Sequence, residues 1–255
     1  MADRRAVTGM ASVHTTLQVL EQVARRQPIG VSDLARAMEL PKTTVQRCLV
    51  TLREAGWLRI IDDRSRWGVT TKPLDIGLRA LSEERIREIA DPFIDELRSE
   101  TDETIHLTVR DGGSLIIVSR KDSRQAVRTY VELGTRAPLH ATSCGLAILA
   151  QLPDTEVDRI LARGLASYTD TTILDEAGLR SEIDRTRGRG YSINASAWWR
   201  PQVCAIGAVV LNENDQPIGA VAISIPSSRF DTRRVPYLGS CAIDTTTKIT
   251  QALRA

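Results

Sequence analysis

Near its start the chain has two short helical patterns joined by a turn of a few residues. Ser32 is predicted to cap the first helix, and Glu39 and Leu40 form the turn. Pro41 then opens the second helix, because proline is favoured in a first turn, where its missing N–H costs nothing. The second helix has an apolar stripe at helical spacing, formed by Val45, Cys48, Leu49 and Leu52. This spacing predicts a helix-turn-helix.

The polar edge of the helix opened by Pro41 predicts contacts with duplex DNA. In a helix-turn-helix, side chains at the start of the second helix reach base edges. Glutamine can bond adenine and arginine can bond guanine through two contacts each, and threonine can bond phosphate or touch a thymine methyl. The predicted contact residues are Lys42, Thr43, Thr44, Gln46 and Arg47, with Ser32 on the preceding helix.

The flanking segments complete a winged version of this motif. A first helix is predicted from a cap at Ser12 to the stop at Gln27 and Pro28. Strand-forming residues on both sides of a DDRS turn predict a short hairpin, or wing, after the second motif helix. Its arginines, Arg59, Arg64 and Arg66, are predicted to contact phosphate or the minor groove. We therefore predict that residues 1–70 form a winged helix-turn-helix domain.

The charge distribution favours contact with a polyanion at the front of the chain. Residues 1–80 contain 13 Lys and Arg against 8 Asp and Glu. The remaining residues contain 21 basic against 24 acidic side chains, so the rear is acidic. Paired short helices occur in many unrelated folds, and an arginine-rich hairpin is usually a solvated loop. The order of helices and wing together with the charge asymmetry favours DNA binding over these alternatives.

Behind the winged helix-turn-helix, the sequence pattern predicts a different architecture. Residues 71–84 are predicted to form a linker helix, whose apolar side a partner subunit would cover. Asp91 and Pro92 are expected to interrupt or start a helix. From Thr104 the pattern changes to strands at 104–109, 115–118, 127–131, 191–194, 203–211 and 219–225, with helices at 144–152, 154–161, 175–187 and 232–253. Residues 85–255 therefore predict an α+β domain.

Other features limit the possible chemistry. The four scattered cysteines contain no Cys-x-x-Cys pair and are expected to be reduced, as in a cytoplasmic protein. No cluster of His, Cys, Asp and Glu has metal-ligand spacing and no glycine-rich phosphate loop is present, so neither a metal nor a cofactor is expected. No apolar run reaches about 18 residues, so no membrane partner is expected.

Six stretches spread over nearly the whole chain match a known pattern: SVHTTLQVLE, VSDLARAMELPKTTVQRCLVTLREAGWL, ETIHLTVRDGGSLIIV, GTRAPLHATSCGLAILAQLP, RGRGYSIN and PQVCAIGAVVLNENDQPIGAVAISIPSSRF. The first two could occur in other winged-helix proteins. The segment LHATSCGLAILA, followed by GYSIN and two C-terminal strands, is much more specific. The chain resembles the IclR family of bacterial transcription regulators.

The resemblance implies a fold, partners and a ligand site. It implies a GAF-like effector-binding and oligomerisation domain over 85–255, a homodimer or dimer of dimers, operator DNA, and a non-enzymatic function, most often repression. The effector would be a small carboxylate or aromatic acid. By resemblance, the effector site comprises Leu139, His140, Ala141, Thr142, Ser143, Cys144 and Gly145 of one loop, and Asn194, Ala205, Ala222 and Ser224 of the late strands.

At three of the strand positions the chain departs from family members that bind carboxylates. Asn194 replaces a frequent Asp, Ala205 a common Cys and Ala222 a common Ser. A pocket with fewer polar side chains should suit a ligand larger or more apolar than glyoxylate or pyruvate. The tandem Trp198 and Trp199 near the pocket rim point the same way, unless both rings simply pack on a neighbouring helix or subunit.

The residues around Cys144 leave two interpretations of the site open. Thr142 or Ser143 can cap the following helix, whose free N–H groups would attract an anion, although a plain structural cap is the alternative. Cys144 lies four residues after His140, so a Cys–His nucleophile pair is conceivable in an enzyme with a winged-helix appendage. A buried, inert thiol is favoured, because free cysteine is among the most buried residue types.

A third hypothesis is a protein–protein adaptor whose winged helix does not touch DNA. The salt dependence of DNA association would distinguish this case, because a DNA binder weakens steeply as salt rises.

Overall fold

A computed structural model describes residues 9–80 and 82–255, and the side-chain burial of these residues outside 77–84. The chain divides into two compact units, Met1–Leu81 and Ser82–Ala255. Each unit has hydrophobic clusters of its own. None of the helices in the described ranges is both long and apolar enough to cross a membrane.

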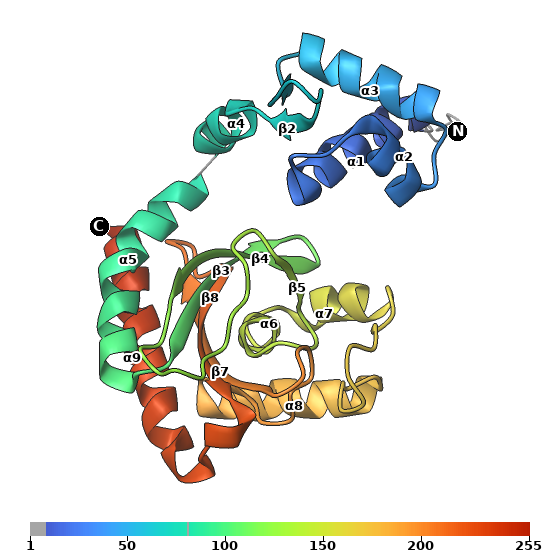
Figure 1. The fold of residues 1–255 in the computed structure, drawn as a ribbon. Helices are drawn as coiled ribbons and strands as arrows, with labels where there is room; N and C mark the ends of the chain where they lie inside the picture. Colours follow the sequence, from blue (N-terminus) through green and yellow to red (C-terminus); the bar gives the residue numbers. More distant parts are fainter. Residues whose placement is uncertain (1–8, 81) are drawn as a thin grey trace. The chain divides into compact units, whose positions relative to one another are not determined.

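The first unit is the predicted winged helix-turn-helix (Figure 1). Its elements are α1 (Ala11–Arg26), α2 (Val31–Met38), α3 (Lys42–Glu54), β1 (Leu58–Ile60), β2 (Trp67–Val69) and α4 (Lys72–Ala80). Glu39 ends α2 in the left-handed region at φ 51°. The strands β1 and β2 pair antiparallel to form the wing. The core under α3 contains Val19, Val23, Leu34, Val45, Leu49, Leu52 and Trp67.

Two predicted helix caps are wrong. Helix α1 starts at Ala11 after Met10, and α2 starts at Val31 after Gly30, with no side-chain cap hydrogen bond at either start. Ser12 and Ser32 therefore lie inside the first turns rather than before them. The reason is that the chain enters both helices one or more residues earlier than the apolar pattern alone indicates.

Helix α1 buries only part of its apolar side within the first unit. Val19 and Val23 are buried, whereas Val13 and Leu17 remain 50% and 51% exposed. Helix α3 and strand β2 pack on one side of α1, so the adjacent side stays uncovered within this unit. In α4, Leu74 and Ile76 are likewise exposed at 62% and 42%. The rest of the predicted linker helix, residues 77–84, lies outside the described side chains.

The second unit is built around a six-stranded antiparallel sheet in the order β5-β4-β3-β8-β7-β6. Helices α5 (Ser82–Thr101) and α9 (Val235–Arg254) cover one face, and α6 (Ser143–Leu149) packs on β7 and β8 from the other (Figure 1). Helices α7 (Asp154–Leu161) and α8 (Glu176–Arg189) lie beyond α6. The strands are β3 (Thr104–Asp111), β4 (Ser114–Lys121), β5 (Arg136–Pro138), β6 (Ser192–Asn194), β7 (Val203–Leu211) and β8 (Pro217–Pro226).

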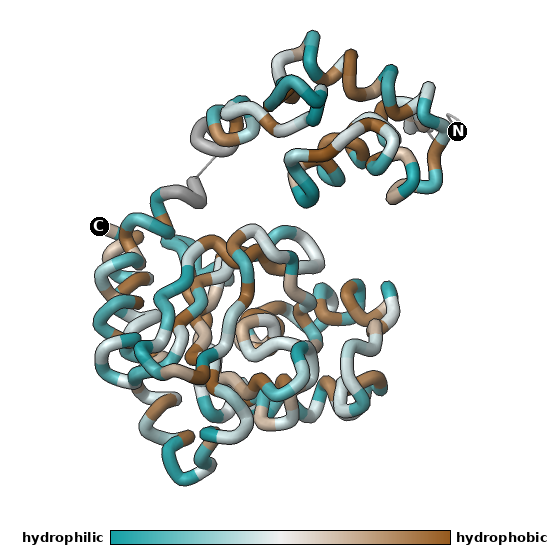
Figure 2. The backbone as a smooth tube through the Cα atoms, viewed as in Figure 1, coloured by the Kyte–Doolittle hydropathy of each residue, from teal (hydrophilic) through white to brown (hydrophobic). Residues whose placement is uncertain are grey.

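The sheet is buried on both faces, and its strand residues alternate between two clusters. Ile105, Leu107 and Val109 of β3 pack with α5 and α9. The intervening His106 and Thr108 point to the opposite face and are also buried. Figure 2 shows hydrophobic residues recurring along the strands and on the helices packed against them. The α+β class predicted from the sequence is confirmed.

Two predicted elements of this unit are wrong. Residues 127–131 form no strand, and the edge strand is β5, which pairs with β4. Val127 and Tyr130 are 65% and 66% exposed, so these strand-forming side chains have no sheet face to pack on. The predicted interruption at Pro92 does not occur, because α5 continues through it. Its buried stripe, Ile86, Ala90, Ile94 and Leu97, spans the proline and fixes the helix against the sheet.

Candidate DNA-contacting surface and ligand cavity

Helix α3 has one anchored edge and one free edge. Its buried residues, Val45, Cys48, Leu49 and Leu52, fix it in the core of the first unit. Lys42, Thr43, Gln46 and Arg47 are exposed on the other edge, and Thr44 is half-buried. Among the described residues, no side-chain hydrogen bond or ion pair holds Lys42, Gln46 or Arg47. These side chains can therefore form hydrogen bonds with a groove of DNA without first breaking contacts within the protein.

Among the described residues, the wing supplies two further cations with no side-chain partner, and a third arginine shapes its turn. Arg59 and Arg64 are exposed. Arg66 instead pairs with Asp62 at 2.6 Å, and the same carboxylate accepts backbone N–H bonds from residues 64 and 66. The Arg66 hydrogen bond holds the pKa of Asp62 below its usual value. Arg66 therefore fixes the wing turn, while Ser32 is exposed on α2.

The second unit contains a small internal cavity between the sheet and the segment around Trp199. Its volume is about 60 Å³. Drug-sized ligands occupy pockets of roughly 300–1,000 Å³, so a ligand of that size requires the cavity to widen. The lining residues are His106, Thr108, Leu115, Ile117, Val131, Ala137, Thr142, Cys144, Asn194, Trp199, Arg200, Val203, Ala205, Ala222 and Ser224. The wall is mostly apolar, with a few polar groups.

All four predicted strand positions line this cavity. They are Asn194 on β6, Ala205 on β7, and Ala222 and Ser224 on β8. The register places them together, since Ala205 pairs with both Asn194 and Ser224 across adjacent strands. The amide oxygen of Asn194 accepts the Trp198 backbone N–H at 3.2 Å and so fixes the start of the segment that closes the cavity.

The predicted loop is divided between the cavity wall and its support. Only Thr142 and Cys144 of this loop line the cavity. Leu139 and His140 line a separate surface hollow, where His140 Nε2 donates to the Ala166 carbonyl at 2.9 Å. The other three residues are buried, namely Ala141, Ser143 and Gly145. The Ser143 carbonyl accepts from Ser192 Oγ at 2.6 Å.

Trp198 and Trp199 lie in different surroundings. Trp198 is buried in the cluster around α6, as in the packing alternative. Trp199 lines the cavity, and the Arg200 guanidinium carbon lies 4.6 Å from its ring centroid. Arg200 is exposed and has no ion pair within the described part of the chain. A cationic group therefore stands at the rim of a mainly apolar cavity.

His106 is a buried polar group in the wall of this cavity. It is 4% exposed, and its Nδ1 lies 3.0 Å from Ser224 Oγ. Its Nε2 is buried and has no hydrogen-bond partner among the described residues. Burial and, to a lesser extent, the positive charge of Arg120 lower the pKa of His106 from 6.5 to about 4. The ring is therefore neutral at physiological pH.

Because burial lowers its pKa, His106 makes the folded unit sensitive to acid. As the pH falls from 6.5 towards 4, the unfolded chain binds the proton before the folded chain does, so His106 then favours unfolding. We expect the free energy of unfolding to lose about 2 kcal/mol through His106 between about pH 7.5 and about pH 5. Urea unfolding of the wild type and His106→Gln at both pH values measures this difference. Equal losses in the two proteins would contradict it.

Cys144 is placed as an inert wall residue. Burial raises the pKa of its thiol to about 12. Its thiol is hydrogen-bonded to the Thr108 side chain, and His140 is hydrogen-bonded to the Ala166 carbonyl. The Thr142 hydroxyl caps α6 by accepting the Gly145 N–H at 3.0 Å. This arrangement favours the structural cap and gives Cys144 neither the base nor the lowered pKa that a nucleophile needs.

We expect Cys144 to resist alkylation in the folded protein. Its thiolate fraction near pH 8 should be at least ten-fold below that of the unfolded chain. Timed iodoacetamide labelling, with peptide mass spectrometry, measures this for each cysteine separately. The same labelling in urea gives the reference rate. Labelling of folded Cys144 at the rate of the unfolded chain would restore the enzymatic hypothesis.

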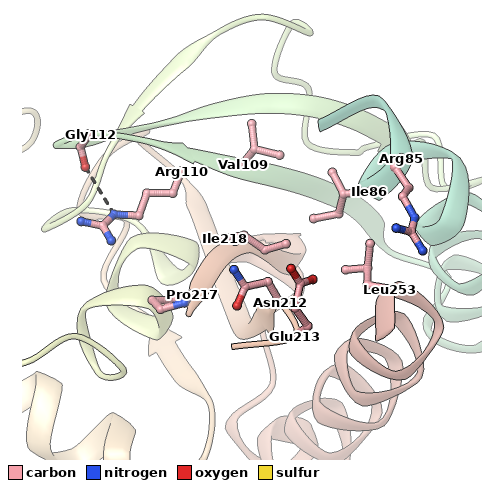
Figure 3. A pocket seen from close by; sticks show the side chains of 10 residues that line it. All are labelled: Arg85, Ile86, Val109, Arg110, Gly112, Asn212, Glu213, Pro217, Ile218 and Leu253. Carbon is pink, nitrogen blue, oxygen red and sulfur yellow. Dashed lines mark hydrogen bonds between the residues drawn. The ribbon is translucent and has the colours of Figure 1, made fainter. Parts of the chain in front are cut away.

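A larger hollow, of about 620 Å³, opens at another edge of the second unit (Figure 3). It lies between the start of α5, the β3–β4 hairpin and the end of α9. Arg110 donates to the Gly112 carbonyl at 3.4 Å and pairs with Glu156, so its charge is already engaged. None of the buried polar atoms that lack partners in the described ranges lies in this hollow. The smaller cavity is therefore the better ligand site.

Several of the cavity-lining residues are not assigned to a ligand site from the sequence. His106 and Thr108 alternate with the apolar Ile105, Leu107 and Val109 in β3, and this alternation is the sequence signal that one face of the strand is polar. Leu115, Ile117, Val131 and Ala137 have ordinary apolar patterns that do not distinguish a cavity wall from a core. Within the described residues, no group of three His, Cys, Asp or Glu side chains could hold a metal ion.

Comparison with known protein families matches both units. A model of the IclR helix-turn-helix domain matches residues 12–60, and a model of the C-terminal part of bacterial IclR regulators matches residues 78–251. The chain is 30% identical to the acetate operon repressor of Salmonella typhimurium, covering 96% of this chain and 91% of that protein. It is also 30% identical to the regulator KipR of Bacillus subtilis, covering 95% and 96% respectively.

Solved structures show the same fold. IclR of Thermotoga maritima has a TM-score of 0.77 at 22% identity, covering 97% of this chain and all of that one. An IclR homologue of Microbacterium hydrocarbonoxydans, solved in complex with 4-hydroxybenzoate, has a TM-score of 0.80 at 20% identity, covering 95% and 99%. The matched family models, the relatives and the winged helix-turn-helix agree: the chain belongs to the IclR family and is a transcriptional regulator with a DNA-binding domain.

Proposed function

We propose that the chain is a ligand-responsive repressor that binds operator DNA through α3 and the wing. The free edge of α3 is the observation on which this proposal rests, because Lys42, Gln46 and Arg47 are exposed while the opposite edge is buried. The proposed contacts are Ser32, Lys42, Thr43, Thr44, Gln46, Arg47, Arg59, Arg64 and Arg66. Relatives named as repressors, such as the acetate operon repressor, support this direction of regulation. A DNA target places the regulator in the cytoplasm.

We assign three parts to the chain. Residues 1–70 bind DNA, residues 71–84 link the units, and residues 85–255 sense the effector and oligomerise. A homodimer or dimer of dimers would present two recognition helices to a near-palindromic operator. The exposed apolar side chains Val13, Leu17, Leu74 and Ile76 support association with a second copy.

The proposed effector is a small organic or aromatic acid bound in the 60 Å³ cavity. The apolar wall suits a hydrocarbon or aromatic body, and the unpaired Arg200 at the rim suits a carboxylate. The homologue solved with 4-hydroxybenzoate supports the acid class. Ligand binding can shift the regulator between DNA-binding states only if the ligand has different affinities for those states.

A DNA-binding and release assay tests this function. The operator is selected from a random duplex pool, and its affinity is measured by mobility shift over a salt series. We expect affinity to fall more than ten-fold between about 50 and 200 mM salt, through counterion release. A thermal-shift screen of aliphatic and aromatic acids then identifies ligands, and each hit is tested for operator release. Failure to select any duplex sequence, or salt-independent binding, would favour the adaptor hypothesis.

A further inference from the structure

His106 and Ser224 form a hydrogen-bonded pair in the wall of the cavity, and the pair leaves one ring nitrogen unused. Nδ1 lies 3.0 Å from Ser224 Oγ, while Nε2 is buried with no partner. Adjacent strands hold the pair, because His106 on β3 lies opposite Ala222 on β8. A buried polar group without a partner is costly, so this nitrogen is a feature that binding of a ligand could relieve.

The hydroxyl of Ser224 determines which tautomer the ring adopts. Within the described residues, His106 Nδ1 is the only hydrogen-bond partner of Ser224 Oγ. If Ser224 donates to Nδ1, the hydroxyl proton is used and only the Nε2–H lacks a partner. If Ser224 accepts instead, its own proton and the Nε2 lone pair both lack partners. The first arrangement leaves fewer buried groups unsatisfied, so the Nε2–H tautomer is favoured.

This tautomer leaves an uncharged donor in the wall. Burial and the charge of Arg120, the cross-strand neighbour of His106 on β4, keep the ring neutral, with a pKa of about 4. The negative charge of Asp122 raises the pKa of His106, but this effect is weaker. The nearby cavity wall is otherwise apolar at Leu115, Ile117, Ala205 and Ala222. A neutral N–H in such surroundings favours an oxygen acceptor and rejects a ligand group that can only donate.

We propose that His106 determines effector specificity by donating its Nε2–H to an oxygen of the ligand, held in that tautomer by Ser224. This inference rests on the proposed ligand-sensing function. It adds which chemical group the ligand presents to His106, at the end opposite its carboxylate. The effector is an organic acid with a second oxygen, a carbonyl or hydroxyl, distant from its carboxylate. As the cavity widens to seat this ligand, the oxygen becomes the partner that Nε2 lacks.

The first test needs no ligand. The chain has three histidines, so a ¹⁵N spectrum that correlates ring nitrogens with ring protons is readily assigned with His106→Gln and His140→Gln. We expect His106 as the neutral Nε2–H tautomer at pH 7, and a mixture of tautomers in Ser224→Ala. A pure Nδ1–H tautomer, or a protonated ring, in the wild type would overturn the proposal.

The second test uses two matched pairs of probes, 4-oxopentanoate with pentanoate and 4-hydroxybenzoate with benzoate. We expect the oxygen-bearing member of at least one pair to bind about ten-fold more tightly and to shift the His106 Nε2 signal. His106→Leu should remove this preference. His106→Gln, whose amide can donate from a similar position, should retain part of it. His14→Gln, at an exposed histidine of α1, serves as the control and should leave the preference unchanged. Circular dichroism and thermal melting check that each variant is folded.

The outcomes separate this inference from the proposed function. A preference that survives His106→Leu, or a His106 signal that none of the four probes moves at millimolar concentration, overturns the specificity role. If the wild type still binds its selected operator in that case, the regulator function stands without it. Loss of sequence-selective DNA binding by the wild type would instead overturn the proposed function.

Discussion

Replacing Gln46 and Arg47 together by alanine is expected to lower operator affinity by about 100-fold or more and to flatten the sequence preference. Each side chain can make a two-point contact with a base, and such a contact contributes about 1–3 kcal/mol of discrimination. Both side chains lie on the exposed edge of α3, so truncating them should not disturb the core. Fluorescence anisotropy with the selected operator and a scrambled duplex of equal length measures affinity and preference together.

A matched control separates base recognition from general charge. Arg233→Ala removes one exposed arginine of the second unit and should leave operator affinity within about two-fold, because this arginine is paired with Asp231 and is not among the proposed DNA contacts. Lys42→Ala should weaken operator and scrambled duplex alike, as expected for a phosphate contact. Unchanged affinity and preference in the double variant would show that α3 is not the recognition helix.

Gly145→Ala is expected to destabilise the second unit by about 3 kcal/mol or more. A Cβ at this position would lie 2.0 Å from the carbonyl oxygen of Leu139 and 2.4 Å from its Cα. Both are backbone atoms, so no side-chain rotation can relieve the overlap. The Thr142 cap holds the loop in place by bonding both the Gly145 N–H and the Pro138 carbonyl. Urea denaturation followed by circular dichroism measures the loss.

Gly188→Ala in α8 is the control for this substitution. A Cβ at Gly188 meets nothing within 4 Å, and its φ is not in the left-handed region. Alanine has the higher helix propensity, so we expect this variant to gain about 0.5–1 kcal/mol. If both variants show the same stability as the wild type, the close approach of the loop to α6 is not maintained in solution.

Sequence patterns located most elements but failed where tertiary packing overrides local preference. Helix α7 and strand β7 coincide with their predicted bounds, because clear periodicity runs to both ends. Residues 127–131 have strand-forming side chains but find no neighbouring strand, and Pro92 remains helical because the buried stripe of α5 continues on both sides. Such outcomes depend on contacts between distant residues, which a local pattern does not contain.

For the candidate site, too, some features follow from the sequence and others depend on tertiary packing. The late-strand residues named by resemblance lie together, since register brings Asn194, Ala205 and Ser224 to one wall of the cavity. Their role in effector binding stays a prediction. The resemblance did not indicate that the loop residues split between the wall and its support, nor that the adjacent Trp198 and Trp199 point to different surroundings. His106 was unassigned, because alternation in a strand buried on both faces does not show which face contains a cavity.

A short junction connects β3, a strand that lines the cavity, to α5, the helix that precedes it in the sequence. Strand β3 begins at Thr104, three residues after α5 ends at Thr101. Glu103, in the junction, is 2% exposed and makes a two-point ion pair with Arg229, with N–O distances of 2.8 and 2.7 Å. This ion pair fixes the junction between two elements. One is β3, which bears His106, and the other is α5, which follows the DNA-binding unit in the sequence. A displacement of β3 on effector binding is therefore expected to move the C-terminal end of α5 as well.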